Sequence, residues 1–383
     1  MHWSAPFKSS LNPAFAGAAA TLSGIGLARF AYVPLFPAMV AAGWITGVQG
    51  GLLGAMNLAG YLVGVLGGRT LAGRIGTARA LDAGMGLAVL TFAACAWNGG
   101  LAWLALWRFF AGLAGGNLMA LAGPAVQGAI APTQRGIGGG IVMTGVGGGV
   151  IAASILMPVL LPAGVSVAWL GLAIVVLSLW AFAHWRWPQT PVALPAAAGS
   201  ARAARAKATA LILAYGLAGA GMVPHMVYFV DYAVRGRGLN AGAASLTWLV
   251  FGIGAVLGTL TGGRIADRWG GSTALKTWLM LQIGALVLAL PSSPVSLWAS
   301  ALLGGFAGIG ITAVALARAR ELAGAGAGVV WVRATALYAL AQAAAGFAVV
   351  PLFAHTNSYL FVFAVGLAVS VIALLVSTLG QYD

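Results

Sequence analysis

The sequence is poor in charged residues, and this scarcity excludes most classes of protein. Only 6% of its 383 residues are charged, and five of these are acidic, whereas soluble domains carry about 25% charged residues. A protein with a solvated exterior needs more charge than this, and disordered and collagen-like chains have other compositions. Because 61% of the residues are hydrophobic, the chain is predicted to lie in a lipid bilayer.

Cysteine and enzymatic signatures are equally scarce. Cys95 is the only cysteine, so the chain can form neither an intramolecular disulfide nor a cysteine-based metal site. The sequence has no His-Glu-x-x-His, no phosphate-binding loop ending in Gly-Lys-Ser/Thr, and no pair of intramembrane aspartates of the kind used in proteolysis. We therefore expect no metal, no cofactor and no enzymatic activity.

Basic residues outnumber acidic ones, and the formal net charge is +14. In a soluble protein this balance would suggest a nucleic-acid partner. Here the basic residues stand between apolar segments, which is the pattern by which a bilayer orients a chain. We expect contact with lipid and no nucleic-acid partner.

Long apolar runs replace the missing charge. Their length of about twenty residues excludes an outer-membrane barrel, whose strands alternate apolar and polar residues over about ten positions. Each run is long enough for a transmembrane helix, which predicts an all-α polytopic protein. The predicted spans are residues 13–40, 47–67, 79–97, 101–130, 137–161, 167–186, 208–233, 241–262, 274–290, 295–317, 328–353 and 359–379.

The basic residues predict the orientation of these spans. If both termini are cytoplasmic, the outer connections hold only Arg235 and Arg237. The inner connections and tails then hold Lys8, Arg69, Arg74, Arg79, Arg135, Arg186, Arg202, Arg205, Lys207, Arg264, Arg268, Lys276, Arg318 and Arg320. This imbalance follows the positive-inside rule and supports an even number of spans.

An internal repeat divides the chain into halves. Five positions recur at a spacing of 194 residues: Gly60, Gly64, Gly68, Arg74 and Gly76 correspond to Gly254, Gly258, Gly262, Arg268 and Gly270. A parallel duplication of this kind predicts two pseudo-symmetric six-helix bundles. We place the first bundle at residues 1–187 and the second at 208–383. The proline- and alanine-rich residues 188–207 are predicted to be a cytoplasmic linker.

The recurring glycines lie four residues apart, so each set forms a helical stripe without side chains. Such a stripe lets a neighbouring backbone approach closely. One interpretation is static helix packing, and the other is a smooth surface on which one half rocks against the other. The residues concerned are Gly60, Gly64, Gly68, Gly254, Gly258 and Gly262.

A short loop pattern connects the sequence to a known family. Residues 263–270 read GRIADRWG, which resembles the inner loop Gly-x-x-x-Asp-Arg-x-Gly of the major facilitator superfamily. Residues 69–76 are the equivalent in the first half but have Gly73 where the aspartate belongs. The resemblance implies that these loops latch the inner gate, because a carboxylate can accept hydrogen bonds from a helix N-terminus and release them. The implied gating residues are Arg74, Asp267 and Arg268.

Other stretches refine the resemblance. Residues 24–37, GIGLARFAYVPLFP, are similar to the YbfB/YjiJ group of that superfamily, whose members are largely uncharacterised transporters of the bacterial cytoplasmic membrane. Residues 108–112 resemble the family's Arg-x-x-x-Gly element. The Gly145-x-x-x-Gly149 pattern resembles the glycine motif of antiporters, without its proline, and favours export. The resemblance also implies that spans one, four, seven and ten line a central site.

Two arginines within predicted spans are candidate substrate residues. A charge at the centre of a bilayer costs about 2.5–3.5 kcal/mol on insertion scales, so Arg29 and Arg108 need a compensating role. Arg29 shares a helix face with Tyr32 and Phe36, which makes a cationic and aromatic stripe suited to a polar or anionic ligand. The alternative is a structural arginine bonded to carbonyls that nearby prolines leave free.

Span seven holds the candidate proton carriers. His225 shares a face with Tyr228, and Asp231 lies near the outer end of the span. The alternatives are a histidine satisfied within the core and an aspartate that pairs with Arg235 one turn on. In span eleven Tyr338 and Gln342 are four residues apart and serve either as interhelical hydrogen-bonding groups or as ligand contacts.

Together these features predict a monomeric secondary transporter. It would move a small organic solute, with a preference for an anion, by alternating access, driven by a proton gradient. Two alternatives stay open: a facilitator without ion coupling, which the scarcity of acidic residues favours, and a membrane receptor or scaffold that transports nothing.

Overall fold

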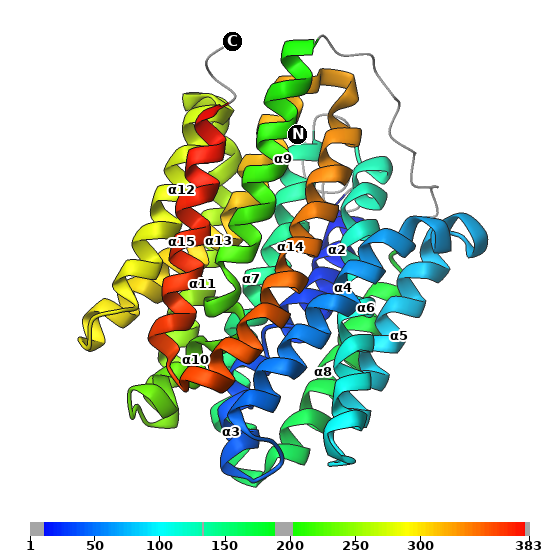
Figure 1. Ribbon diagram of the computed structural model, residues 1–383. Coiled ribbons are helices and arrows are strands. Elements are labelled where there is room, and N and C mark those ends of the chain that lie inside the picture. The colour runs from blue at the N-terminus through cyan, green and yellow to red at the C-terminus, as the bar shows by residue number, and fades with distance from the viewer. Residues whose placement is uncertain (1–10, 132–133, 188–201, 380–383) are drawn as a thin grey trace, which may run out of the picture. The chain divides into compact units, whose positions relative to one another are not determined.

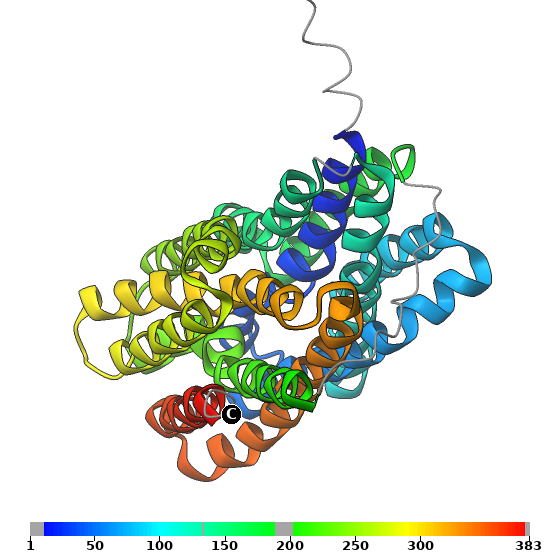
Figure 2. The same cartoon turned by 90° about the horizontal axis from the view of Figure 1, so that it is seen from above.

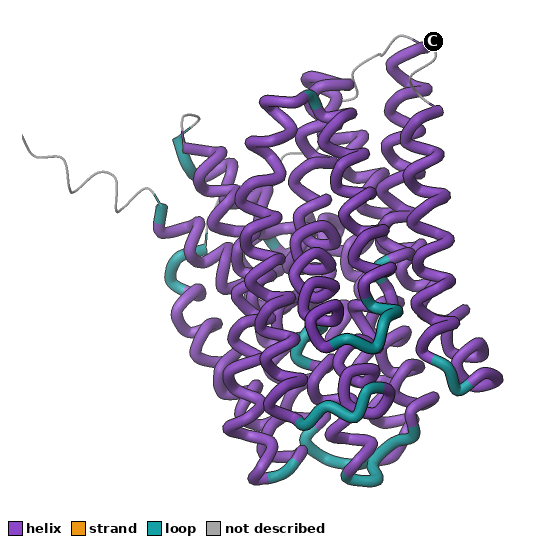
Figure 3. Tube along the Cα trace, turned by 90° about the vertical axis from the view of Figure 1, so that its left-hand side faces the viewer, coloured by secondary structure: helices purple, strands orange, loops and turns teal. Residues whose placement is uncertain are grey.

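The structure is a computed structural model that describes residues 11–131, 134–187 and 202–379. Within these ranges the chain consists of helices and short loops, without a strand (Figures 1 and 3). Twelve helical segments are long and apolar enough to span a membrane, which confirms the all-α fold with twelve spans. The α-helices are α2 (Asn12–Thr21), α3 (Tyr32–Ala41), α4 (Gly47–Ile75), α5 (Thr77–Cys95), α6 (Gly100–Ala129), α7 (Arg135–Leu160), α8 (Val165–His184), α9 (Arg202–Gly221), α10 (Phe229–Asp231), α11 (Ala241–Trp269), α12 (Gly271–Leu288), α13 (Pro294–Ala323), α14 (Ala327–Thr356) and α15 (Tyr359–Leu379).

The predicted linker is described only in part. Residues 188–201 lie outside the described residues, whereas residues 202–207 form the first turns of α9. This segment reads RAARAK, and alanine, arginine and lysine are all strong helix formers. The basic end of the predicted linker is therefore helical.

Two compact units make up the chain. Unit 1 comprises Met1–Ile45 and Met56–Ala193, and unit 2 comprises Thr46–Ala55 and Leu194–Asp383. The first turns of α4 thus pack with unit 2, while the rest of that helix belongs to unit 1. Within unit 2, α15 runs beside α9 and α12 (Figures 1 and 2).

Two of the spans are interrupted by π-helical turns. In the first span, residues Leu22–Leu27 form such a turn between α2 and α3, and the amide of Ala28 donates to the carbonyl of Ser23, five residues back, at 3.0 Å. In the seventh span, the π-helical turn Pro224–Tyr228 begins at a proline, which has no amide hydrogen to donate. Such turns are frequent at functional sites, and these two lie beside Arg29 and around His225.

The glycine stripe of α4 packs against α6 within unit 1. A Cβ atom at Gly60 would lie 1.8 Å from the carbonyl oxygen of Phe109, and one at Gly64 would lie 2.2 Å from that of Leu113. Gly68 lies over the side chain of Asn117. Any side chain at Gly60 or Gly64 would force the two helices apart.

The second stripe makes the same kind of contact within unit 2. Cβ atoms at Gly254 and Gly258 would lie 2.2 and 2.0 Å from the carbonyl oxygens of Leu302 and Phe306 in α13, and Gly262 faces Gly310. Both stripes therefore join the second span of a unit to its fourth span. These contacts are what the static packing interpretation requires.

The joints after α4 and α11 also match. Gly76 and Gly270 have φ angles of 90° and 81°, a region that residues with a Cβ atom rarely adopt. Each glycine ends one long helix and begins the next, α5 or α12. The last glycine of the repeated loop pattern is thus needed by the backbone in both halves.

Candidate functional site

Arg108 is buried in unit 1, near the beginning of α6. Its side chain is 2% exposed, its Nη1 atom donates to the carbonyl oxygen of Ala28 at 2.8 Å, and its guanidinium carbon lies 4.3 Å from the centre of the Tyr32 ring. Asn57 supports this arrangement by donating to the carbonyl of Arg108 at 3.2 Å. The buried Nε atom of Arg108 has no hydrogen-bond partner within the described part of the chain.

Arg29 follows the π-helical turn of the first span. Its guanidinium carbon lies 4.2 Å from the centre of the Tyr61 ring, and the residue is 7% exposed. Because Arg108 is bonded to the residue that precedes Arg29, the two cations occupy neighbouring positions. Each of them faces an aromatic ring from another helix, which is an arrangement worth about 2 kcal/mol or more when desolvated.

The aromatic stripe of the first span is divided between the two arginines. Tyr32 and Phe36 stack with ring centres 5.9 Å apart and an angle of 12°, which agrees with the shared face expected from their spacing. Tyr32, however, lies under Arg108, whereas Arg29 turns to Tyr61. Arg108 donates to a carbonyl of this span, that of Ala28. The alternative for Arg29, a bond to carbonyls that the nearby prolines leave free, stays a prediction.

Negative charge is nearly missing from unit 1. Asp82 is the only acidic residue in its sequence, and that carboxylate has partners at the end of α8. One of its oxygens accepts from the indole nitrogens of Trp180 and Trp187 at 2.8 and 2.7 Å and lies 2.9 Å from Nδ1 of His184. The positive charge of the two buried arginines is therefore faced by rings and carbonyls of this unit.

His225 is fully buried in unit 2. Its Nε2 atom lies 2.9 Å from the hydroxyl of Ser300, which donates its own proton to the carbonyl of Ala285 at 2.7 Å. The serine oxygen must then accept from the imidazole, which places the histidine proton on Nε2. Phe229 and Phe363 pack against the ring with centre distances of 4.7 and 5.3 Å.

Asp231 is held by two donors. Arg235 binds both carboxylate oxygens, at 2.6 and 2.5 Å, and the hydroxyl of Tyr359 donates to one of them at 2.6 Å. The aspartate has no exposed surface. The pairing with Arg235 one turn on, which was the alternative to a proton carrier, is the arrangement present.

The tyrosines of the seventh span point to different partners. The ring of Tyr228 packs against Phe353, with centres 5.5 Å apart. The hydroxyl of Tyr232 accepts from Nε of Arg237 at 2.7 Å and donates to the carbonyl of Ala289 at 2.9 Å. Tyr232 is therefore part of a polar group at the end of the span.

Tyr338 and Gln342 of α14 both face the seventh span. Tyr338 stacks on Tyr215 with ring centres 4.4 Å apart, and Gln342 donates to the sulfur of Met226 at 3.0 Å. Gln342 is fully buried. These contacts join α14 to its neighbours inside unit 2.

The predicted gating residues lie at helix ends and are exposed: Arg74 in α4, and Asp267 and Arg268 in α11. A carboxylate does accept from a helix N-terminus here, but it belongs to Glu321, which is bonded to the amide of Gly271 at 2.9 Å and to Arg318 at 2.7 Å. The hydrogen bond expected of the loop aspartate is thus made in unit 2 by a residue at the end of α13.

Several residues that contact the candidate site residues were not predicted from the sequence. Tyr61 lies four residues after Asn57, so the two share a helix face. This spacing could have indicated that Tyr61 faces the same buried region as the polar Asn57. Glu321 follows Arg318 by three residues, which is the spacing of a helical ion pair. Ser300 and Tyr359 have no local signal, because their partners are 75 and 128 residues away in sequence.

Comparison with known proteins supports the interpretation of the fold. The family model described as "Uncharacterised MFS-type transporter YbfB" matches residues 21–378, which covers most of both units and includes Arg29, Arg108 and His225. A search of the curated proteins found no match.

Proposed function

Because the chain belongs to the family of uncharacterised MFS-type transporters represented by YbfB, a group within the major facilitator superfamily, we propose that it carries a small organic anion across the membrane by alternating access. Membership of this family and twelve apolar helices make the chain a membrane transporter. The preference for an anion rests on one observation, the pair of buried arginines in unit 1.

The two buried arginines favour an anionic substrate on electrostatic grounds. A guanidinium within the membrane costs about 2.5–3.5 kcal/mol on insertion scales. The aromatic rings and the Ala28 carbonyl can offset this cost, but they do not cancel the positive charge. An anionic substrate would cancel it, and the partnerless Nε donor of Arg108 is a hydrogen-bonding group that such a substrate can use. A cationic substrate would be repelled by both arginines.

Thermal stability of the purified protein tests this proposal. A ligand that binds the folded state at a concentration of 100 times its Kd stabilises that state by about 2.7 kcal/mol. We expect a panel of carboxylates and organophosphates to contain compounds that raise the unfolding temperature, and amines and neutral sugars to leave it unchanged. Stabilisation by amines alone would contradict the assignment of an anion.

The Arg29→Ala variant provides the matching test of the site. We expect it to remain folded in the membrane and to lose both the stabilisation by the anion and its transport in reconstituted vesicles. Arg79→Ala removes the same charge from an exposed position of α5 and should behave like the wild type. Wild-type transport by Arg29→Ala would remove that residue from the site.

For the coupling ion we propose a proton carried by His225. The histidine is buried, its proton lies on Nε2, and its Nδ1 atom makes no hydrogen bond with a described residue, so a second proton has a position to occupy. Asp231 is a poorer carrier, because Arg235 and Tyr359 already occupy its carboxylate. A facilitator without ion coupling is the alternative. It is favoured by the contacts of Asp231 with Arg235 and Tyr359, which leave that carboxylate poorly suited to carry a proton.

The direction of transport and the membrane that holds the protein are also proposals. The two glycines of the antiporter-like motif lie against the first span: a Cβ atom at Gly149 would be 2.4 Å from the Cα atom of Gly26, and one at Gly145 would be 2.2 Å from the carbonyl oxygen of Ala18. A motif that shapes the span carrying Arg29 supports export. The distribution of basic residues supports cytoplasmic termini. We further propose a bacterial cytoplasmic membrane and a monomeric protein.

A receptor or scaffold that transports nothing is the alternative from another class. Cysteine accessibility discriminates between them, because Cys95 is the only native cysteine and is buried. New cysteines placed along the first and seventh spans should react with a polar reagent from either side of the membrane if the protein is a transporter. Reaction from neither side would favour a scaffold.

A further inference from the structure

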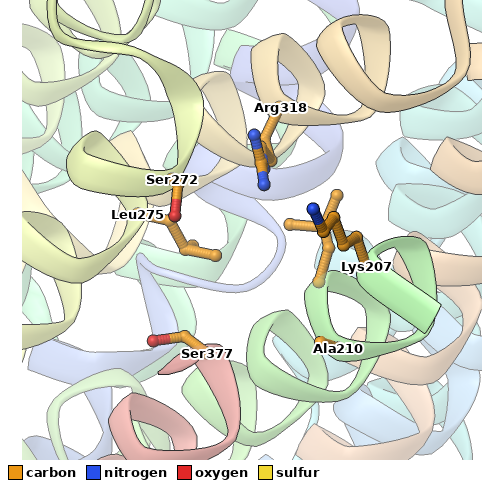
Figure 4. A pocket seen from close by; sticks show the side chains of 7 residues that line it. Lys207, Ala210, Ser272, Leu275, Arg318 and Ser377 are labelled. Carbon is orange, nitrogen blue, oxygen red and sulfur yellow. The ribbon is translucent and has the colours of Figure 1, made fainter. Parts of the chain in front are cut away.

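A basic pocket lies at one end of unit 2, away from His225. It is formed where α9 and α12 begin and where α13 and α15 end (Figure 4). The space between its walls is small and partly open to the outside. The lining residues are Lys207, Ala210, Leu211, Ser272, Leu275, Arg318 and Ser377.

Two cationic side chains reach into this pocket from different helices. Figure 4 shows the amino group of Lys207 and the guanidinium of Arg318 turned towards the space between the helices. Lys207 is half-buried and has no ion-pair or hydrogen-bond partner within residues 11–131, 134–187 and 202–379. An ammonium group held in a pocket without a partner is suited to an anion.

Arg318 has donors to spare. Its Nη1 atom binds Glu321 at 2.7 Å, and the side chain is only 14% exposed. A guanidinium has five N–H donors, so most of them stay available on the pocket side of the ion pair. Arg318 and Glu321 together are neutral, which leaves the pocket with the single positive charge of Lys207.

The polar and apolar walls define the ligand further. Ser272 and Ser377 also line the space, although the Ser377 hydroxyl donates to the carbonyl of Leu374, and Leu211 and Leu275 make an apolar wall. One net positive charge matches a singly charged phosphodiester better than a doubly charged phosphate. Basic pockets between membrane helices are known to suit the head groups of anionic lipids.

We infer that this pocket binds one phosphate group, as the phosphodiester of an anionic phospholipid. The ammonium of Lys207 supplies the charge, and Arg318 supplies directional donors. The acyl chains would follow the apolar surface of the helices, since large apolar side chains of α15, among them Leu375 and Leu379, are exposed.

Lipid titration of the purified, delipidated protein tests the inference. Phosphatidylglycerol should raise the unfolding temperature and bind at one saturable site in native mass spectrometry, and phosphatidylcholine should do neither. One basic residue near a membrane surface contributes about 1 kcal/mol, so Lys207→Gln should weaken the affinity for phosphatidylglycerol about fivefold or more. Lys207→Arg should restore it.

Arg264→Gln is the matched control, because it removes the same charge from an exposed position of α11. It should leave the affinity for phosphatidylglycerol unchanged, which separates the pocket from a general effect of basic residues. Equal affinity of the wild type and Lys207→Gln would overturn the inference, and so would equal binding of the two lipids. Lys207→Gln is not expected to unfold, because the residue is half-buried and has no partner to lose.

Inorganic phosphate distinguishes the source of the ligand. If the pocket takes a lipid, phosphate at millimolar concentration should displace little phosphatidylglycerol. If phosphate alone stabilises the wild type, fails to stabilise Lys207→Gln, and phosphatidylglycerol has no effect, the lipid assignment is overturned in favour of a soluble phosphate compound.

Discussion

Replacement of Arg108 by methionine separates a structural role from a substrate role. Methionine has nearly the length of arginine and adapts to irregular sites, so Arg108→Met removes the guanidinium without leaving a large cavity. The variant loses the hydrogen bond to Ala28 and the contact with the Tyr32 ring. It also removes a buried charge, which by itself favours the folded state.

These opposing contributions can be compared. A hydrogen bond from a charged donor is worth about 1.5–3 kcal/mol, and a desolvated cation–π contact about 2 kcal/mol. Removal of the charge from the membrane returns about 2.5–3.5 kcal/mol. The free energy of unfolding should therefore fall by only about 0–2.5 kcal/mol. The Ala28 carbonyl does not lose every donor, because the side-chain amide of Asn57 lies 3.5 Å from it.

Substrate binding should respond far more strongly. Loss of one member of a buried charge pair costs about 2–5 kcal/mol, and each 1.4 kcal/mol is a factor of ten, so the affinity for an anion should fall about 30-fold or more. Thermal unfolding measures the first effect, and titration calorimetry with an anion from the panel measures the second. Arg79→Met, at an exposed position of α5, should change neither quantity by a measurable amount.

Two results would refute this reasoning. A fall of more than about 4 kcal/mol in the free energy of unfolding would exceed the sum expected from the lost hydrogen bond, the lost cation–π contact and the removed charge. Arg108 would then be a structural residue. Unchanged affinity for the anion in a folded Arg108→Met protein would remove the guanidinium from the substrate site.

Four further substitutions test three separate parts of the structure. Gly258→Ala should lower the unfolding temperature, because the new methyl group would meet a backbone carbonyl at 2.0 Å. Gly263→Ala, five residues along the same helix in open space, should raise it slightly, and the opposite order would disprove the packing interpretation. Arg235→Gln should destabilise the protein by about 3–5 kcal/mol in denaturant titration, since it leaves the buried Asp231 unpaired, and a change below about 1 kcal/mol would contradict that burial. His225→Asn should leave transport insensitive to a pH difference across vesicles, and a retained pH response would exclude His225 as the proton carrier.

Much of the fold could be predicted from the sequence because bilayer physics is simple. A span needs about twenty apolar residues, and the predicted segment 137–161 differs little from the observed span Ile137–Ala163. The internal duplication could also be recognised from the sequence. The glycines of α4 and α11 make equivalent backbone contacts, so they must recur at equivalent positions in the two halves. Gly76 and Gly270 recur for a similar reason, which is their positive φ angle.

The details of the sites depended on contacts between distant segments. The sequence pattern placed Tyr32 beside Arg29, but the structure pairs Tyr32 with Arg108 and Arg29 with Tyr61. A helical wheel reports which residues share a face and says nothing of which helix that face meets. The π-helical turn Leu22–Leu27 adds to the difficulty, because it shifts the register of the face by a fraction of a turn.

The place where Gly26 meets Gly149 has a practical consequence. A Cβ atom at Gly26 would lie only 2.6 Å from the Cα atom of Gly149, so the peptide chains of the first span and α7 touch with no side chain between them. A rearrangement of the first span when a substrate reaches Arg29 must then displace α7 as well. A spectroscopic probe attached to the lipid-facing side of α7 would report occupancy of the arginine site without disturbing it.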